Sequence, residues 1–95
     1  MTTFIVRFQL EAGTLQDYER LRNLLINAGF SKKIQAKDGR YYFLPQGEYI
    51  GETNKSRDEV LQIAAANAAK IRRRYKVLVI ESAPHGCAWI NLSPA

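Results

Sequence analysis

Residues 14–30, TLQDYERLRNLLINAGF, have the pattern of a short amphipathic helix with both of its ends. Thr14 and Asp17 are spaced as in a capping box, in which each side chain accepts a hydrogen bond from the backbone N–H of the other. Gly29 suits the left-handed position that closes a helix, where Phe30 can fold back onto the last turn. Between these ends, apolar residues recur at helical spacing at Leu15, Tyr18, Leu21, Leu25 and Ala28. The segment therefore predicts one helix whose apolar stripe must be covered by the rest of the chain.

Strand and helix patterns lie on both sides of this first helix. Alternating apolar residues predict a strand over Thr3–Leu10. Ser56 and Glu59 form a second capping box, which opens a predicted helix that runs through about Ile71. The apolar run of Tyr75–Ser82 predicts another strand.

The segment Lys37-Asp38-Gly39-Arg40 carries the signal of a β-hairpin, because Asp-Gly tolerates positive φ at both positions of a two-residue turn. With this turn, Ile34 lies opposite Phe43. The core-facing side of the hairpin then holds Ile34, Ala36, Tyr41 and Phe43. The other side is basic and holds Lys33, Gln35, Lys37, Arg40 and Tyr42. Pro45 ends the hairpin, and residues 46–54 are predicted to form a loop.

The order strand, helix, hairpin, helix, strand indicates an α+β fold and matches the split βαβ order of ferredoxin-like domains. We therefore predict a single domain over residues 1–95, a βαββαβ sandwich in which two helices cover one face of an antiparallel sheet. Residues 87–92 could add a short C-terminal edge strand. The other sheet face is expected to be open and to hold Ile5, Arg7, Lys33, Lys37, Arg40 and Tyr42.

The charge of the chain favours a negatively charged partner. Fourteen Lys and Arg residues against nine Asp and Glu residues give a net charge of +5 and a pI of about 9.6, although many small basic domains bind no polyanion. The single cysteine, Cys87, excludes an internal disulfide. No signal-peptide pattern and no apolar run of membrane length is visible, so we expect a cytoplasmic protein without membrane contact. No metal-binding or cofactor-binding motif is visible, so we expect neither group.

The predicted open sheet face is the first candidate for an RNA-binding surface. It combines one aromatic ring, Tyr42, with the cations Arg7, Lys33, Lys37 and Arg40. The ring could stack a base while the cations neutralise phosphates. One aromatic residue is a small number for a surface that stacks bases. The alternatives are therefore that this face is solvated or that it is the contact surface of a homodimer.

Arginines outside the sheet form two more candidates for phosphate contact. Arg20 and Arg22 are two positions apart and cannot share a helical face, so Arg20 is expected to point to solvent and Arg22 to lie at the rim of the buried stripe. They are either ordinary solvated residues or the groups that orient a scissile phosphate. The run Arg72-Arg73-Arg74 either attracts phosphates or complements the dipole at the end of the second helix.

His85, the only histidine, is the candidate for proton transfer. A loop imidazole titrates near neutrality and can act as a general acid or base. The alternative is a loop histidine without a role in function. His85 and Cys87 together are too few ligands for a zinc site.

Residues 17–25, DYERLRNLL, and the pair Gly29-Phe30 resemble the GhoS family of type V antitoxins, which are small ferredoxin-like proteins of about this length. The resemblance covers about the first half of the chain and continues weakly through Asp38-Gly39. It implies an endoribonuclease that cleaves the messenger RNA of a small membrane toxin. It also implies that Arg20 and Arg22 match the paired arginines of the first helix of the family.

Charge and resemblance together predict an RNA-binding protein, with metal-independent endoribonuclease activity on a toxin mRNA as the more specific hypothesis. In that mechanism the 2′-hydroxyl of RNA is the nucleophile, Arg20 and Arg22 hold the phosphate, and His85 is the candidate base. A binding regulator without nuclease activity is a related hypothesis. The alternative from another class is a non-catalytic protein-interaction or homodimerisation module, which would use its open sheet face or an edge strand.

Overall fold

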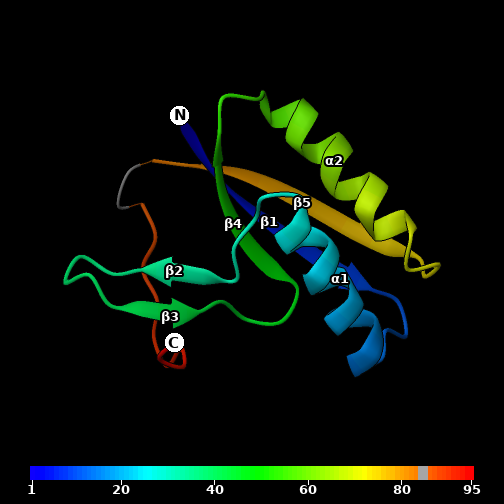
Figure 1. Ribbon diagram of the computed structural model, residues 1–95, viewed down its shortest axis with the longest axis horizontal. Coiled ribbons are helices and arrows are strands. Elements are labelled where there is room, and N and C mark those ends of the chain that lie inside the picture. Colours follow the sequence, from blue (N-terminus) through cyan, green and yellow to red (C-terminus); the bar gives the residue numbers. More distant parts are fainter. Residues whose placement is uncertain (84–85) are drawn as a thin grey trace.

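Two helices pack over one face of an antiparallel sheet in the computed structural model, which describes residues 1–83 and 86–95 (Figure 1). The elements follow the order β1 (Thr2–Leu10), α1 (Leu15–Asn27), β2 (Lys33–Gln35), β3 (Tyr41–Phe43), β4 (Glu48–Thr53), α2 (Arg57–Ala69) and β5 (Tyr75–Ser82). No helix of the described chain covers the opposite sheet face. The predicted α+β class, with an antiparallel sheet and two helices on one side, is confirmed.

Strand β1 is the centre of the main sheet, whose order is β4-β1-β5. It pairs antiparallel with both neighbours, and Ile5 lies opposite Ile50 on β4 and Ile80 on β5. Side chains alternate along a strand, so Phe4 and Val6 point the other way, toward the helices. The strands predicted from alternation and from the apolar run of β5 are confirmed.

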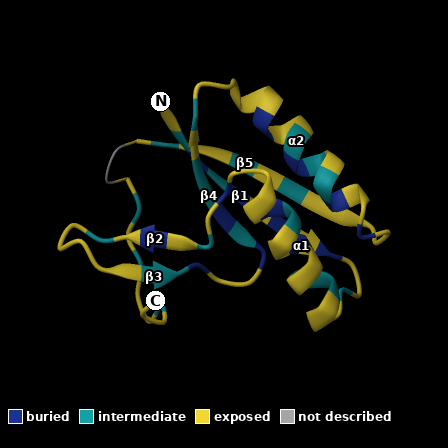
Figure 2. Ribbon diagram, viewed as in Figure 1, coloured by how far each residue is buried: buried dark blue, intermediate teal, exposed yellow. Residues whose placement is uncertain are grey.

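The core lies between this sheet and the helices, and Figure 2 shows the buried residues on the facing sides of both layers. Its largest fully buried side chains are Tyr49, Phe4, Leu21, Leu25, Val6 and Val60. Helix α2 contributes Ala64 and Ala68, which are both fully buried. Their short side chains let the α2 backbone approach the sheet closely, as the alanine-rich sequence predicts.

Both helices begin at the predicted capping boxes. The Thr14 hydroxyl accepts a hydrogen bond from the Asp17 N–H at 3.1 Å, and the Asp17 carboxylate accepts one from the Thr14 N–H at 3.0 Å. Ser56 and Glu59 repeat this arrangement at 3.1 Å and 3.0 Å. At the end of α1, Gly29 takes a φ of +98°, the left-handed conformation expected there.

Strand β4 corrects the prediction that residues 46–54 form a loop. Glu48–Thr53 pairs along the edge of β1, with Tyr49 buried on the helix-covered side. Gly51 and two glutamates lower the strand propensity of this segment, so its strand conformation comes from pairing with β1 rather than from local preference.

The β2–β3 hairpin forms a separate two-stranded sheet, so its strands do not join the main sheet as predicted. The only ladder connection to the main sheet in the described chain is a bridge between Ser31 and Ile50, at the free edge of β4. The two residues exchange N–H to carbonyl bonds of 2.7 Å and 2.9 Å. Beyond this bridge, the hairpin projects away from the helices and the main sheet (Figure 1).

The register of the hairpin also differs by one residue from the prediction. Ile34 lies opposite Tyr42, not opposite Phe43, because the connection has three residues rather than two. Ala36 donates its N–H to the Arg40 carbonyl at 2.8 Å, and only Gly39 within the turn has a positive φ. A three-residue turn closed by a left-handed glycine therefore replaces the two-residue Asp-Gly turn.

The C-terminal segment packs along the hairpin instead of adding an edge strand over residues 87–92. The Ser93 carbonyl accepts a hydrogen bond from the Phe43 N–H at 2.9 Å, and the Tyr41 carbonyl accepts one from the Ala95 N–H at 3.0 Å. The Trp89 ring lies 5.7 Å from the Tyr42 ring between centroids. The hairpin and the chain end thus stabilise each other.

Candidate nucleic-acid interface

The predicted functional residues occupy three separate regions rather than one. Arg7 lies on the open sheet face, which is the side of the main sheet not covered by the helices. The hairpin carries Lys33, Lys37, Arg40 and Tyr42. Arg20 and Arg22 lie on α1, while Arg72, Arg73 and Arg74 connect α2 to β5. His85 lies outside the described residues.

Arg7 is electrically compensated by Glu48 on the neighbouring strand. Its Nε and Nη2 atoms each lie 2.6 Å from Glu48 Oε1. The side chain of Arg7 is 58% exposed, whereas that of Glu48 is 16% exposed. Because the carboxylate satisfies the guanidinium, Arg7 contributes little free positive charge to this face.

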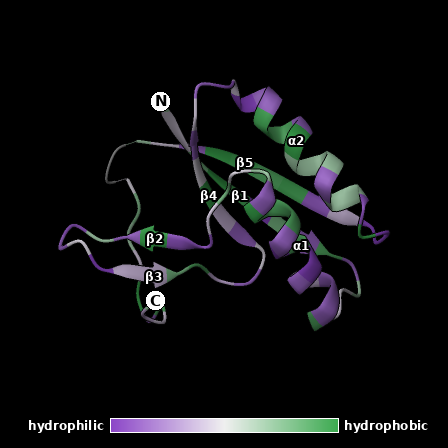
Figure 3. Cartoon of the chain, viewed as in Figure 1, coloured by the Kyte–Doolittle hydropathy of each residue, from purple (hydrophilic) through white to green (hydrophobic). Residues whose placement is uncertain are grey.

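The middle of the open sheet face is apolar, which sequence reasoning missed. Ile50, Ile5 and Ile80 form a row across β4, β1 and β5. Leu78 and Ile80 remain 51% and 41% exposed. Figure 3 shows apolar residues along most of β5. The expected mixture of cations around one aromatic ring is absent from this part of the described sheet.

Tyr42 lies on the other side of the hairpin from the one predicted, where its ring has a neighbour. The one-residue register change places it on the same side of the hairpin as buried Ile34, where it packs against Trp89. Tyr41, predicted to face the core, is 48% exposed instead. On that exposed side, the ammonium group of Lys33 lies 5.8 Å from the centre of the Phe43 ring.

The two remaining hairpin cations stay at the exposed turn. Arg40 lies 3.8 Å from a carboxylate oxygen of Asp38, at the distance limit of an ion pair. Lys37 makes no ion pair with any described residue. The hairpin is therefore a basic protrusion and not part of the open sheet face.

Arg20 is exposed on α1, as predicted. Arg22, predicted to lie at the rim of the buried stripe, is exposed as well and lies near a half-buried lysine. Burial lowers the pKa of Lys32 to about 8; Glu48 opposes the shift, and the nearby Arg22 adds to it. The Lys32 ammonium donates to the Glu48 carbonyl at 3.0 Å and to the Pro45 carbonyl, and it lies 4.7 Å from the centre of the Tyr49 ring. Lys32 is thus a structural cation that supports the loop before β4.

The three arginines at positions 72–74 differ in their contacts. Arg73 binds the carboxylate of Asp17 at 3.0 Å and ties the end of α2 to the start of α1. This contact helps to keep the pKa of Asp17 low, although the Thr14 backbone N–H is the larger cause. Arg72 takes a φ of +63° as the chain turns from α2 toward β5. Arg74 lines a hollow.

A hollow of about 420 Å³ lies where β1 ends and β5 begins. It is lined by Gln9, Glu11, Arg74, Tyr75 and Lys76. Sequence reasoning named only Arg74 among them. Strand alternation could have found Gln9 and Glu11, because they follow Arg7 on the same side of β1.

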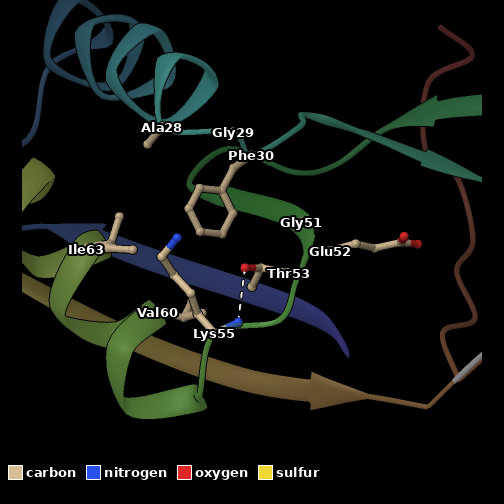
Figure 4. A pocket seen from close by; sticks show the side chains of 9 residues that line it. All are labelled: Ala28, Gly29, Phe30, Gly51, Glu52, Thr53, Lys55, Val60 and Ile63. Atoms are coloured by element: carbon tan, nitrogen blue, oxygen red, sulfur yellow. Dashed lines mark hydrogen bonds between the residues drawn. The ribbon is translucent and has the colours of Figure 1, made fainter. Parts of the chain in front are cut away.

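A smaller hollow of about 110 Å³ lies between the end of α1, β4 and the start of α2. Figure 4 shows the Lys55 ammonium group directed toward the Phe30 ring, while Glu52 points away. Thr53 accepts a hydrogen bond from the Lys55 N–H at 3.2 Å, which fixes the chain before α2. The walls are mostly apolar, so this hollow offers one cation and little else for a ligand.

Within the described residues, no group of three His, Cys, Asp or Glu side chains is placed to hold a metal ion. In the same part of the chain, no helix combines the length and the hydrophobicity that crossing a membrane requires. No protein-family model matches this chain, and no curated protein is significantly similar to it.

Proposed function

We propose that the protein is a cytoplasmic RNA-binding protein, and one observation carries this proposal. Fourteen side chains are Lys or Arg, and four of them form ion pairs with described residues, which leaves ten without an acidic partner within 4 Å. Such charges repel one another in the free protein and are neutralised by phosphates on binding. RNA binding would therefore account for the positive charge that the fold itself does not use, which excludes Lys32 because this residue supports the loop before β4.

The more specific form of the proposal is a metal-independent endoribonuclease of the GhoS antitoxin type, acting on a toxin mRNA. This proposal includes a ferredoxin-like arrangement of the sheet. In such a sheet a fourth strand would pair with the free edge of β4, and the Ser31–Ile50 bridge lies at that edge. Arg20 and Arg22 are exposed and free to hold a phosphate. The RNA 2′-hydroxyl would be the nucleophile, and His85 is the proposed base.

The test is incubation of the protein with a labelled structured RNA, with and without EDTA, at low and moderate salt. Discrete EDTA-resistant cleavage that is lost in the Arg20→Ala/Arg22→Ala variant supports the nuclease. An Arg57→Ala/Lys70→Ala variant removes two cations from α2 and serves as the matched control. Salt-sensitive binding without products supports the binding function and contradicts the nuclease. Absence of binding at low salt contradicts both.

A second candidate, self-association through the open sheet face, is favoured by the exposed Leu78 and Ile80 beside the Ile5 row. Large apolar side chains gathered on one sheet face are typical of contact surfaces. Sedimentation velocity over a range of concentrations tests it. An Ile80→Lys variant is expected to stay monomeric, whereas Leu61→Lys on exposed α2 is the control and leaves the association unchanged. A wild-type protein that remains monomeric at all concentrations contradicts this candidate.

A further inference from the structure

We infer that the hollow at the end of β1 and the start of β5 is a subsite for one unpaired RNA base, with guanine preferred. The inference rests on the proposed RNA-binding function and assigns it a place and a base preference. The hollow of about 420 Å³ falls in the range of small-molecule sites, roughly 300–1,000 Å³.

The strand register brings the polar groups of the hollow to one side of the sheet. Gln9 lies opposite Lys76, and side chains of opposed residues point to the same side. The Glu11 N–H donates to the Arg74 carbonyl at 2.8 Å, which continues the ladder by one step and sets Glu11 opposite Arg74. Lys76 thus lies opposite Gln9, and Arg74 lies opposite Glu11. Two cations therefore face an amide and a carboxylate on one side of the sheet.

These side chains have no partners within the described protein. No hydrogen bond or ion pair in that part of the chain involves the side chains of Gln9, Glu11, Arg74 or Lys76, and all four residues are exposed. This distinguishes them from Arg7, which lies on the same side of β1 but is held by Glu48. Their donors and acceptors are available to a ligand.

Arg74 and Lys76 supply the positive charge of the subsite, and their side chains lie on the same side of the sheet. Tyr75 lies between them in the chain and also lines the hollow. It stands opposite buried Leu10, so its ring points to the helix-covered side and is not a stacking surface for the base. The two cations would hold the phosphates on either side of the base.

Glu11 gives the subsite its base preference. A carboxylate only accepts hydrogen bonds, and the Watson–Crick edge of guanine offers two adjacent donors, N1–H and N2–H. Adenine and cytosine offer one exocyclic amine each, whereas uracil presents one N–H between two carbonyl oxygens that repel a carboxylate. The expected order is therefore guanine first and uracil last.

Labelled pentaribonucleotides that differ only at the central base, UUGUU, UUAUU, UUCUU and UUUUU, test this by fluorescence anisotropy. We expect UUGUU to bind about tenfold more tightly than UUUUU. Glu11→Gln should remove most of this preference without weakening UUUUU binding. Arg74→Ala should weaken all four pentamers alike, because it removes a phosphate contact and leaves Glu11 in place. Arg57→Ala, on α2 and outside the hollow, is the control and keeps the preference.

The outcomes separate this inference from the function on which it rests. If all four pentamers bind with equal, salt-sensitive affinity and Glu11→Gln changes nothing, the base subsite is wrong while RNA binding stands. The subsite is equally wrong if Arg74→Ala binds UUGUU as tightly as the wild type does. If no pentamer and no longer RNA binds at low salt, the proposed function itself fails.

Discussion

Arg7 and Glu48 face each other across the β1–β4 register and form an ion pair with N–O distances of 2.6 Å. The pair lies beside exposed Leu78, on the side of the sheet that sequence reasoning assigned to RNA. It shows that a cation on an open face is not automatically a phosphate ligand. Whether the charge is free depends on a residue that is distant in the sequence.

Joint removal of Arg7 and Glu48 is expected to have little effect on RNA affinity. Arg7→Ala/Glu48→Ala should change the dissociation constant for a single-stranded RNA less than twofold, because the two charges that it removes cancel each other. Arg74→Ala, which removes a cation without an acidic partner, should weaken binding and reduce the salt dependence by about one phosphate contact. Anisotropy titrations over several salt concentrations measure both effects. A loss in the Arg7→Ala/Glu48→Ala variant as large as in Arg74→Ala would contradict this prediction.

Glu48→Gln is the complementary change. It frees the Arg7 guanidinium while retaining a neutral side chain of similar size, so RNA affinity should rise and its salt dependence should steepen. Glu52→Gln, on the same side of β4 but without an ion pair to any described residue, is the matched control. An equal rise in both variants would show a general charge effect instead of a released arginine.

The packing of Phe30 on Gly51 predicts a steric coupling between the two positions (Figure 4). A Cβ atom on Gly51 would lie 2.8 Å from Phe30 Cδ1 and 3.1 Å from Cε1. Gly51→Ala should therefore lower the free energy of unfolding by about 1–3 kcal/mol. Urea unfolding of Gly51→Ala, Phe30→Leu and the double variant measures the coupling. The double variant should lose less than the sum of the single losses, and strict additivity would contradict the contact.

The elements that the sequence predicts well are those with complete local signals. Helices α1 and α2 begin at capping boxes, and β1 and β5 have strand patterns that need no knowledge of distant residues. Strand β4 lacks such a pattern because Gly51 interrupts it. The need for that glycine comes from Phe30, which follows α1 and packs over it. Local propensity could not reveal this contact.

The placement of Tyr42 differs from the prediction for the same reason. An Asp-Gly pair is compatible with both a two-residue and a three-residue connection, and the choice reverses which side of the hairpin Tyr42 occupies. The C-terminal segment pairs with the hairpin at Pro94 and places Trp89 against the Tyr42 ring. The orientation of the Tyr42 ring thus depends on a segment that lies about fifty residues further along the chain.

The N-cap of α2 predicts a measurable loss of stability. Ser56→Ala removes the hydroxyl that accepts from the Glu59 N–H at 3.1 Å and should lower the free energy of unfolding by about 1 kcal/mol. In a domain of this size, that corresponds to a fall in Tm of roughly 4–8 °C. Ser56→Asp keeps an acceptor at the cap and should unfold near the wild-type temperature. If both variants lose the same stability, the cap hydrogen bond is not the cause.

The half-buried Lys32 predicts a rise in stability at alkaline pH. Burial lowers its pKa in the folded protein to about 8 from the ordinary 10.5. Between these values the unfolded chain still binds the proton that the folded chain has released, so the free energy of unfolding increases with pH. Below pH 8 the ammonium is charged in both states, and its full desolvation penalty opposes folding. Because water still screens this half-buried group, the expected gain is about 1 kcal/mol.

Tyr49 limits this rise from the alkaline side. Burial raises its pKa to about 12 from the ordinary 10, so above pH 10 the unfolded chain releases a phenol proton that the folded chain keeps. The contribution of Tyr49 is complete below pH 10 and declines as the pH approaches 12. The Lys32 effect is therefore best measured by urea unfolding at pH 7 and pH 9.5. Lys32→Met should abolish the rise, while Lys33→Met, an exposed neighbour, should retain it. Parallel pH profiles for the wild type and Lys32→Met would show that Lys32 carries no such burial penalty.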